Sequence, residues 1–179
     1  MRFNPDIHNR QSTRLQNYNY ASGGAYYVTI CAKNRESIFS HIHVGAGLAP
    51  AQVKLTKVGK IIEKNWRNIP KEYNNIDIGE FIIIPNHLHG ILFKRATARV
   101  APTLGQIIGK FKSKCSTEYL KYIYENNIND KAQIWQRNYY EHIIRSKASL
   151  DEIRKYIINN PFTWEFDEEN KNANNKVSA

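Results

Sequence analysis

Two histidines separated by one leucine are the first candidates for chemistry in this chain. His87 and His89 lie in an apolar, β-branched run, and alternate residues of a β-strand point to the same face. Both imidazoles can therefore approach one cation, which imidazole nitrogen binds readily. A carboxamide or carboxylate oxygen from another element would complete a mixed nitrogen and oxygen site that suits Mg²⁺ or Mn²⁺.

The same pattern of histidine, hydrophobic residue and histidine recurs at His41 and His43. The surroundings distinguish the two pairs, because residues 81–93 carry the strongest strand signal, whereas His43 adjoins a Gly- and Ala-rich stretch at residues 44–51. We therefore predict that His87 and His89 are the ligands. The alternative is that both pairs are ordinary polar residues of strands.

Tyr156 and Asn160 are four residues apart in a helical pattern, which places a phenol and an amide on one helical face. A phenol with a pKa near ~10 is a poor nucleophile, but a cation that polarises a phosphate makes its attack feasible. The chain has 11 tyrosines, so the residues alone also permit Tyr156 to be a structural aromatic beside Ile153 and Ile157.

Periodicity and turn signals predict the elements that must position these side chains. A strand is expected at 25–31, a helix at 55–68, a strand pair at 76–84 and 87–93, a helix at 103–124 and a strand at 134–144. A capping box that begins at Ser149 opens a short final helix that ends at Asn160-Pro161. This order predicts a ferredoxin-like α+β fold, with helices on one face of an antiparallel sheet and an additional C-terminal helix.

The amino-acid composition limits the kinds of partner, chemistry and location that are expected for this chain. Its 26 Lys and Arg outnumber 16 Asp and Glu, which gives a formal charge of +10 and makes nucleic acid the first partner to consider. The two cysteines, Cys31 and Cys115, form no C-x-x-C pair for zinc or redox chemistry. No stretch reaches the ~20 apolar residues of a membrane span, and residues 1–20 lack the apolar core of a signal peptide, so a cytoplasmic protein is expected.

Several segments, in order from about residue 14 to 164, resemble the REP-associated tyrosine transposases, relatives of the single-tyrosine HUH transposases. The matching segments are Arg14-Leu15 with Tyr18-Asn19-Tyr20, residues 26–31, Pro85-Asn86-His87-Leu88-His89-Gly90, residues 134–145 and Tyr156-Ile157-Ile158-Asn159-Asn160-Pro161. The chain departs from the family at Asn19, where an acidic residue is expected, and at residues 44–51 and 96–102, which look inserted.

The resemblance implies a metal-dependent DNA nickase and strand transferase. His87 and His89 would bind the divalent metal, Asn160 would be its third ligand, and Tyr156 would attack a DNA phosphodiester. The products would be a 5′-phosphotyrosine and a free 3′-OH, which can be rejoined without ATP. The catalytic domain would span residues 21–166, between a basic arm at 1–20 and a disordered tail at 167–179.

Substrates of the family are single-stranded or hairpin DNA of the REP palindrome type, so a nucleoid-associated protein is expected. Basic side chains would contact phosphates, and exposed tyrosines could stack on unpaired bases. The predicted phosphate contacts are Arg2, Arg10, Arg14, Lys110, Lys112, Lys114, Arg137 and Arg145. The sequence leaves open whether the protein is a monomer or a homodimer, and whether Tyr156 serves its own histidines or those of a partner subunit.

Two other functions remain open at this stage. The first is a protein that binds DNA hairpins on the same fold without turnover; the presence of His87, His89, Tyr156 and Asn160 together argues against it. The second is an RNA-binding ferredoxin-like domain, whose sheet would stack bases on aromatic rings. That domain would show affinity that depends on the 2′-OH, and it would need no metal.

Overall fold

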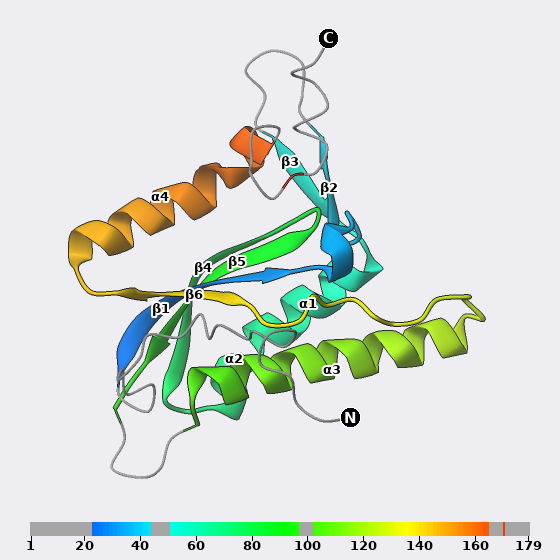
Figure 1. Ribbon diagram of the computed structural model, residues 1–179, viewed down its shortest axis with the longest axis horizontal. Helices are drawn as coiled ribbons and strands as arrows, with labels where there is room; N and C mark the ends of the chain where they lie inside the picture. The colour runs from blue at the N-terminus through cyan, green and yellow to red at the C-terminus, as the bar shows by residue number, and fades with distance from the viewer. Residues whose placement is uncertain (1–22, 44–50, 97–101, 165–169, 171–179) are drawn as a thin grey trace, which may run out of the picture.

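The computed structural model describes residues 23–43, 51–96, 102–164 and 170 of the 179-residue chain. A four-stranded sheet with the order β4-β5-β1-β6 forms its centre, and every neighbouring pair is antiparallel (Figure 1). The strands are β1 (Gly24–Cys31), β4 (Ile76–Ile84), β5 (His87–Lys94) and β6 (Tyr140–Ile144). Their order and the intervening helices confirm the predicted ferredoxin-like α+β fold.

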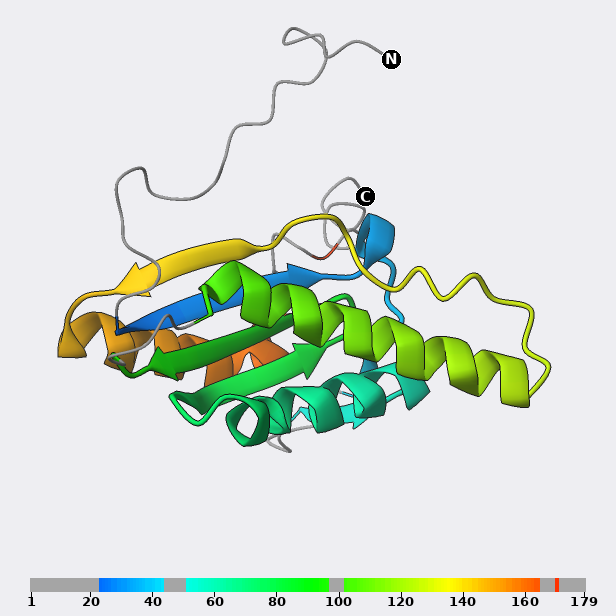
Figure 2. The same ribbon diagram turned by 90° about the horizontal axis from the view of Figure 1, so that it is seen from below.

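The helices lie on both faces of this sheet. Helices α1 (Lys57–Arg67), α2 (Ile69–Glu72) and α3 (Leu104–Glu125) lie on one side, as Figure 2 shows, whereas α4 (Lys147–Thr163) lies on the opposite face. Among the helices that the structure describes, the additional C-terminal helix expected from the sequence is therefore the one that covers this opposite face. None of the helices in the described ranges combines the length and apolar character needed to cross a membrane.

The main hydrophobic core fills the space between the sheet and helices α1 and α3. Tyr26, Val28 and Ile30 alternate along β1 and are completely buried there. Gly90 on β5 leaves room for Trp66 of α1, because a Cβ atom at residue 90 would lie 2.4 Å from Cζ2 of that indole. Packing against Trp66 therefore holds the even-numbered residues of β5 toward the main core. The odd-numbered residues of β5 must then point to the opposite face of the sheet.

A second, much smaller cluster holds α4 on the other face. Its fully buried members are Ile91 of β5, Ile144 of β6 and Ile157 of α4. Tyr27, Ile82, Phe93, Leu150 and Ile153 are partly buried around it, together with Ala25. The odd-numbered face of β5 is thus shared between this cluster and the two histidines.

The predicted strand at 134–144 was wrong in its first half. Asn138 has φ 64°, in the left-handed region, so an extended ladder cannot continue through it. Trp135 makes only an isolated bridge with Ala32, and the regular strand begins at Tyr140. Within residues 134–139 only Ile134 is buried, and Trp135 and Tyr139 are partly buried, so these side chains pack against the protein without forming a strand.

The predicted start and end of the last helix were also wrong. Ser146 is the N-cap, and its side chain accepts a hydrogen bond from the backbone N–H of Ser149, so the helix begins earlier than expected. It continues through Pro161 to Thr163. Pro161 lies in the last turn and is buried, so it removes one helical hydrogen bond without ending the helix.

A small hairpin was not predicted. Strands β2 (Ser40–His43) and β3 (Gln52–Leu55) form a separate two-stranded antiparallel sheet, so Leu55 belongs to a strand and α1 begins at Lys57, after the N-cap Thr56. A single 3₁₀ turn, Lys33–Arg35, follows β1. The predicted N-terminal arm, the expected loop stretches 44–50 and 97–101, and the expected tail lie outside the described residues, except Asn170.

Candidate active site

His87 and His89 open strand β5 and point to the face that α4 covers. Their side chains are 0% and 3% exposed, and their Nε2 atoms lie 2.6 Å apart. The opposing residues on β1 are Cys31 and Thr29. The alternation of a strand has thus brought the two imidazoles together, as the sequence predicted.

The Nδ1 atoms of both rings are bound by protein groups. Asn86 accepts from His87 through Oδ1, at 2.8 Å from Nδ1, and its Nδ2 donates to the carbonyl of Arg35 at 3.3 Å. For His89, Nδ1 lies 2.6 Å from the hydroxyl of Tyr27 and 2.9 Å from that of Thr29. Such partners fix the orientation and tautomer of imidazoles that bind metals, and here they leave both Nε2 atoms facing one point.

The charge state of His87 suits the same role. Burial lowers the pKa of its imidazole well below 6.5, and the neighbouring His89 and Arg35 lower the pKa further. The ring is therefore neutral at physiological pH, and its Nε2 directs a lone pair toward Nε2 of His89. Because the carboxamide oxygen of Asn86 can only accept, the proton of His87 resides on Nδ1.

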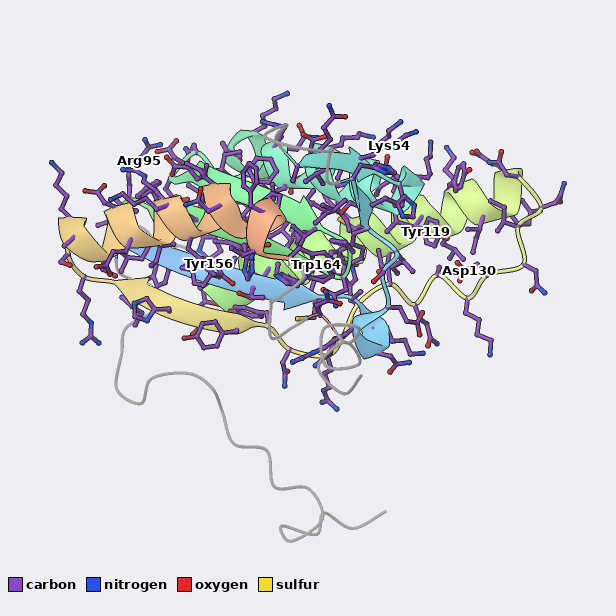
Figure 3. All side chains as sticks on the ribbon, turned by 90° about the horizontal axis from the view of Figure 1, so that it is seen from above. Lys54, Arg95, Tyr119, Asp130, Tyr156 and Trp164 are labelled. Atoms are coloured by element: carbon purple, nitrogen blue, oxygen red, sulfur yellow. The ribbon has the colours of Figure 1, made fainter. Side chains whose placement is uncertain are left out.

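Helix α4 places the phenol of Tyr156 beside this pair. The hydroxyl of Tyr156 lies 3.4 Å from Nε2 of His89, and the side chain is 45% exposed. Figure 3 shows Tyr156 on the flank of α4 that lies over β1, where its ring meets that of Tyr27 edge-on at 6.4 Å. The half-exposed phenol of Tyr156 and the two buried imidazoles thus lie together within one chain.

Asn160 lies one turn after Tyr156 and is completely buried. Within the ranges that the structure describes, no cluster of three or more His, Cys, Asp or Glu side chains could hold a metal. An oxygen ligand for a cation at the two histidines would therefore have to be of another kind, such as an amide oxygen. Two nitrogen ligands at about 2.1 Å in octahedral geometry lie roughly 3 Å apart, close to the spacing of the two Nε2 atoms.

The His41 and His43 pair has a different setting. Both rings are exposed on β2, in the separate hairpin with β3. The features that distinguish His87 and His89 are burial, oriented Nδ1 atoms and a neighbouring phenol. The donor set at residues 87 and 89 therefore fits a cation better.

The predicted phosphate contacts fall into three groups. Lys110, Lys112 and Lys114 lie on α3, on the face of the sheet opposite α4 and Tyr156 (Figure 2). Arg137 and Arg145 are exposed on either side of β6, in the sheet that carries the site. Arg2, Arg10 and Arg14 lie outside the described residues.

The three lysines predicted to contact phosphates from α3 already have partners within the protein. Lys110 and Lys114 form ion pairs with Glu72 of α2. Lys112 donates to the carbonyls of Gln136 and Asn138 at 2.6 and 2.9 Å, and burial lowers its pKa. Lys112 therefore holds the irregular segment that precedes β6.

Sequence reasoning missed the residues that orient the imidazoles. Tyr27 and Thr29 alternate on β1, and this spacing was visible as a pair of polar side chains on one face of a strand. Their register against His89 was not visible, because strand pairing sets it. Asn86 was named only as part of a segment that resembles the family and was given no role at the site, although it directly precedes His87.

Comparisons with known proteins agree with this geometry. The family model described as "Transposase IS200 like" matches residues 21–160, which include His87, His89, Tyr156 and Asn160. An uncharacterized protein of Haemophilus influenzae (strain Rd) is 40% identical over 185 residues, which cover 93% of this chain and 96% of that protein.

Two solved structures are also similar. A REP-associated tyrosine transposase bound to a REP hairpin has a TM-score of 0.51 at 16% identity, over 84% of this chain and 74% of that one. A Deinococcus radiodurans protein described as a transposase has a TM-score of 0.46 at 15% identity, over 82% and 95%. The first likeness shows the shared fold. Since the family model spans most of the sequence and the whole candidate site, the chain belongs to the IS200-like transposase family.

Proposed function

We propose that this protein is a metal-dependent DNA nickase and strand transferase in which Tyr156 is the nucleophile. The observation that carries the proposal is the 3.4 Å approach of the Tyr156 hydroxyl to Nε2 of His89, which itself faces Nε2 of His87. A half-exposed phenol beside two oriented, buried imidazoles suits attack on a phosphodiester.

In the proposed step, the Tyr156 oxygen forms a bond to phosphorus while the bond from phosphorus to the 3′ oxygen breaks. The phenolic proton passes to solvent, and the departing oxygen takes a proton to become a 3′-OH. The 5′ end stays attached to Tyr156, so the reverse attack by a 3′-OH rejoins a strand without ATP. The step is therefore reversible and supports strand transfer.

His87, His89 and Asn160 would hold the cation, Mg²⁺ or Mn²⁺. Bound there, the cation would polarise the phosphate and neutralise charge that develops on its oxygens. The hydroxyls of Tyr27 and Thr29 keep His89 turned toward that position. Because Tyr156 approaches the histidines of its own chain, a monomer would suffice for cleavage.

We propose hairpin DNA of the REP type, with single-stranded flanks, as the substrate. The similar transposase was solved with a REP hairpin, and the net charge of +10 favours a polyanion. Tyr140 on β6 is 54% exposed, and its ring lies 6.5 Å from that of Tyr27. An unpaired base beside the cleaved phosphate could stack on Tyr140, while Arg137 and Arg145 contact the flanking backbone.

Incubation with a 3′-labelled REP hairpin and Mn²⁺ tests the function, because the fragment attached to Tyr156 keeps the 3′ end. We expect a covalent protein–DNA adduct on a denaturing gel that disappears in Tyr156→Phe and on addition of a chelator. Tyr124→Phe is the matched control, because Tyr124 is 85% exposed on α3 and should leave the adduct unchanged. Tight hairpin binding without any adduct would instead favour a binding protein without turnover.

A further inference from the structure

A β-bulge in β4 turns a carboxylate toward the helix that carries Tyr156. Ile78 pairs with Leu92, but Phe81 pairs with Gly90, so Gly79 and Glu80 together face the single residue Ile91. Ile78 and Phe81 both pack against the main core. The extra residue of the bulge therefore leaves Glu80 on the other face of the sheet, beneath α4.

Gly79 makes this bulge possible. A Cβ atom at residue 79 would lie 2.8 Å from Cε2 of Phe93 and 3.0 Å from Cβ of Ile91. Any larger residue would push against both side chains, and Ile91 is a buried member of the small cluster under α4. The sequence Gly79-Glu80 thus combines the space for a bulge with the side chain that the bulge turns outward.

Arg154 of α4 is the partner of Glu80. Its Nε lies 2.9 Å from Oε2 of Glu80, and its Nη1 lies 3.6 Å from Oδ1 of Asp151 on the same helix. The two side chains of the pair are 36% and 35% exposed. The guanidinium therefore connects α4 to β4 through a directed hydrogen bond that is partly shielded from solvent.

The position of this ion pair on α4 lets it affect where the Tyr156 side chain lies. Residues 154 and 156 are separated by about 200° around a helix axis, so they occupy opposite flanks of α4, with Ile157 facing the sheet between them. A roll of α4 by about 20° would move a side chain about 6 Å from the axis by roughly 2 Å. Displacements of this size at a nucleophile strongly reduce reaction rates.

Apolar packing alone restrains that roll only weakly. Ile157 is the only α4 residue among the fully buried members of the small cluster, whereas most of the core lies on the other face of the sheet. An added polar contact on the β4 flank therefore has a disproportionate effect on the orientation of the helix.

We propose that Glu80 and Arg154 are positioning residues that set the height of the Tyr156 hydroxyl above His89. The inference rests on the proposed function for its kinetic test. The pair acts through the orientation of α4, and it lies on the flank away from the predicted cation and phosphate.

A double-mutant cycle tests the proposal with Glu80→Gln, Arg154→Gln and the double variant. Single-turnover cleavage is measured at saturating hairpin DNA and Mn²⁺, alongside the hairpin Kd. We expect each single variant to cleave about tenfold more slowly with an unchanged Kd, and the double variant to be no slower than the worse single one. Arg154→Lys should recover part of the rate.

Unchanged cleavage rates, or losses that multiply in the double variant, would overturn the proposal. Lys121→Gln is the matched control, because Lys121 pairs with Glu125 at 3.6 Å within α3, on the opposite face of the sheet. It should leave the cleavage rate at the wild-type value. A similar loss in Lys121→Gln would also count against the pair, because general destabilisation would then explain the effect.

A second measurement does not require cleavage. With 3-fluorotyrosine at position 156, the ¹⁹F chemical shift reports the surroundings of that ring. We expect the signal to move toward that of a solvent-exposed fluorotyrosine in Glu80→Gln and Arg154→Gln. A signal that stays in place overturns the proposal whatever the activity. If the signal moves in these variants while the wild-type protein forms no DNA adduct, positioning by the pair is supported and the nickase function is refuted.

Discussion

The hydroxyl of Tyr27 lies 2.6 Å from Nδ1 of His89, while Nε2 of the same imidazole faces the Tyr156 hydroxyl at 3.4 Å. One ring thus connects the central strand β1 to the helix that supplies the proposed nucleophile. The second hydroxyl on Nδ1, from Thr29, lies at 2.9 Å. The orientation of His89 is therefore determined by β1.

Removal of both hydroxyls should weaken metal binding. In the variant Tyr27→Phe with Thr29→Val, His89 loses the groups that hold Nδ1, and loss of such outer groups typically weakens metal affinity by about 10- to 100-fold. Titration calorimetry with Mn²⁺ measures the change. Tyr124→Phe should bind Mn²⁺ like the wild type, and equal affinity in the double variant would show that β1 does not orient the ligand.

We expect metal binding to require an oxygen ligand at position 160, which either the Asn160 amide or an introduced carboxylate can supply. We expect Asn160→Ala to lose most Mn²⁺ affinity because an oxygen ligand is gone, and Asn160→Asp to retain it because a carboxylate oxygen is a good ligand for this cation. Electron paramagnetic resonance of bound Mn²⁺ distinguishes the variants. If Asn160→Ala bound Mn²⁺ normally, the third ligand would have to be another group.

The metal-free protein should lose stability in mild acid because of His87. Its folded pKa lies well below 6.5, so the unfolded chain takes up a proton near pH 6.5 while the folded protein does not. The free energy of unfolding should therefore fall as the pH decreases below about 6.5. Urea unfolding with a chelator at pH 7.5 and 5.5 measures this fall, which should be smaller in His87→Asn; equal falls in both proteins would contradict the assignment.

Lys112 and Arg145 should differ in what they contribute. Lys112→Met leaves the carbonyls of Gln136 and Asn138 without their donor, so we expect a loss of about 1–3 kcal/mol in unfolding free energy and little change in DNA affinity. Arg145→Gln should weaken hairpin binding and lower the salt dependence by about one counterion. A stable Lys112→Met protein that has lost DNA affinity would reverse the two roles.

The sequence was informative wherever local pattern determines structure. Strand Ile76–Ile84 has the predicted bounds, and the histidines of β5 share a face because the alternation of a strand leaves no other arrangement. Thr103 caps α3 through a capping box with Gln106, next to the predicted start of that helix.

Other features depend on tertiary contacts that the sequence does not display. Asn138 has a left-handed φ that interrupts the predicted strand, and Pro161 lies in the last turn of α4, where the helix continues to Thr163. The bulge at Gly79-Glu80 and the role of Tyr27 follow from strand register. In the sequence, Lys112 has the pattern of an exposed cation on a helix. Its hydrogen bonds to the carbonyls of Gln136 and Asn138 form only in the folded chain.

Anomalous diffraction from crystals grown with Mn²⁺ and a REP hairpin would locate the metal and the phosphate relative to Tyr156. We predict one manganese bound to Nε2 of His87, Nε2 of His89 and the Asn160 amide oxygen, with a DNA phosphate between the metal and the Tyr156 hydroxyl. Manganese at His41 and His43, or a phosphate held away from Tyr156 at a fully occupied site, would contradict this prediction.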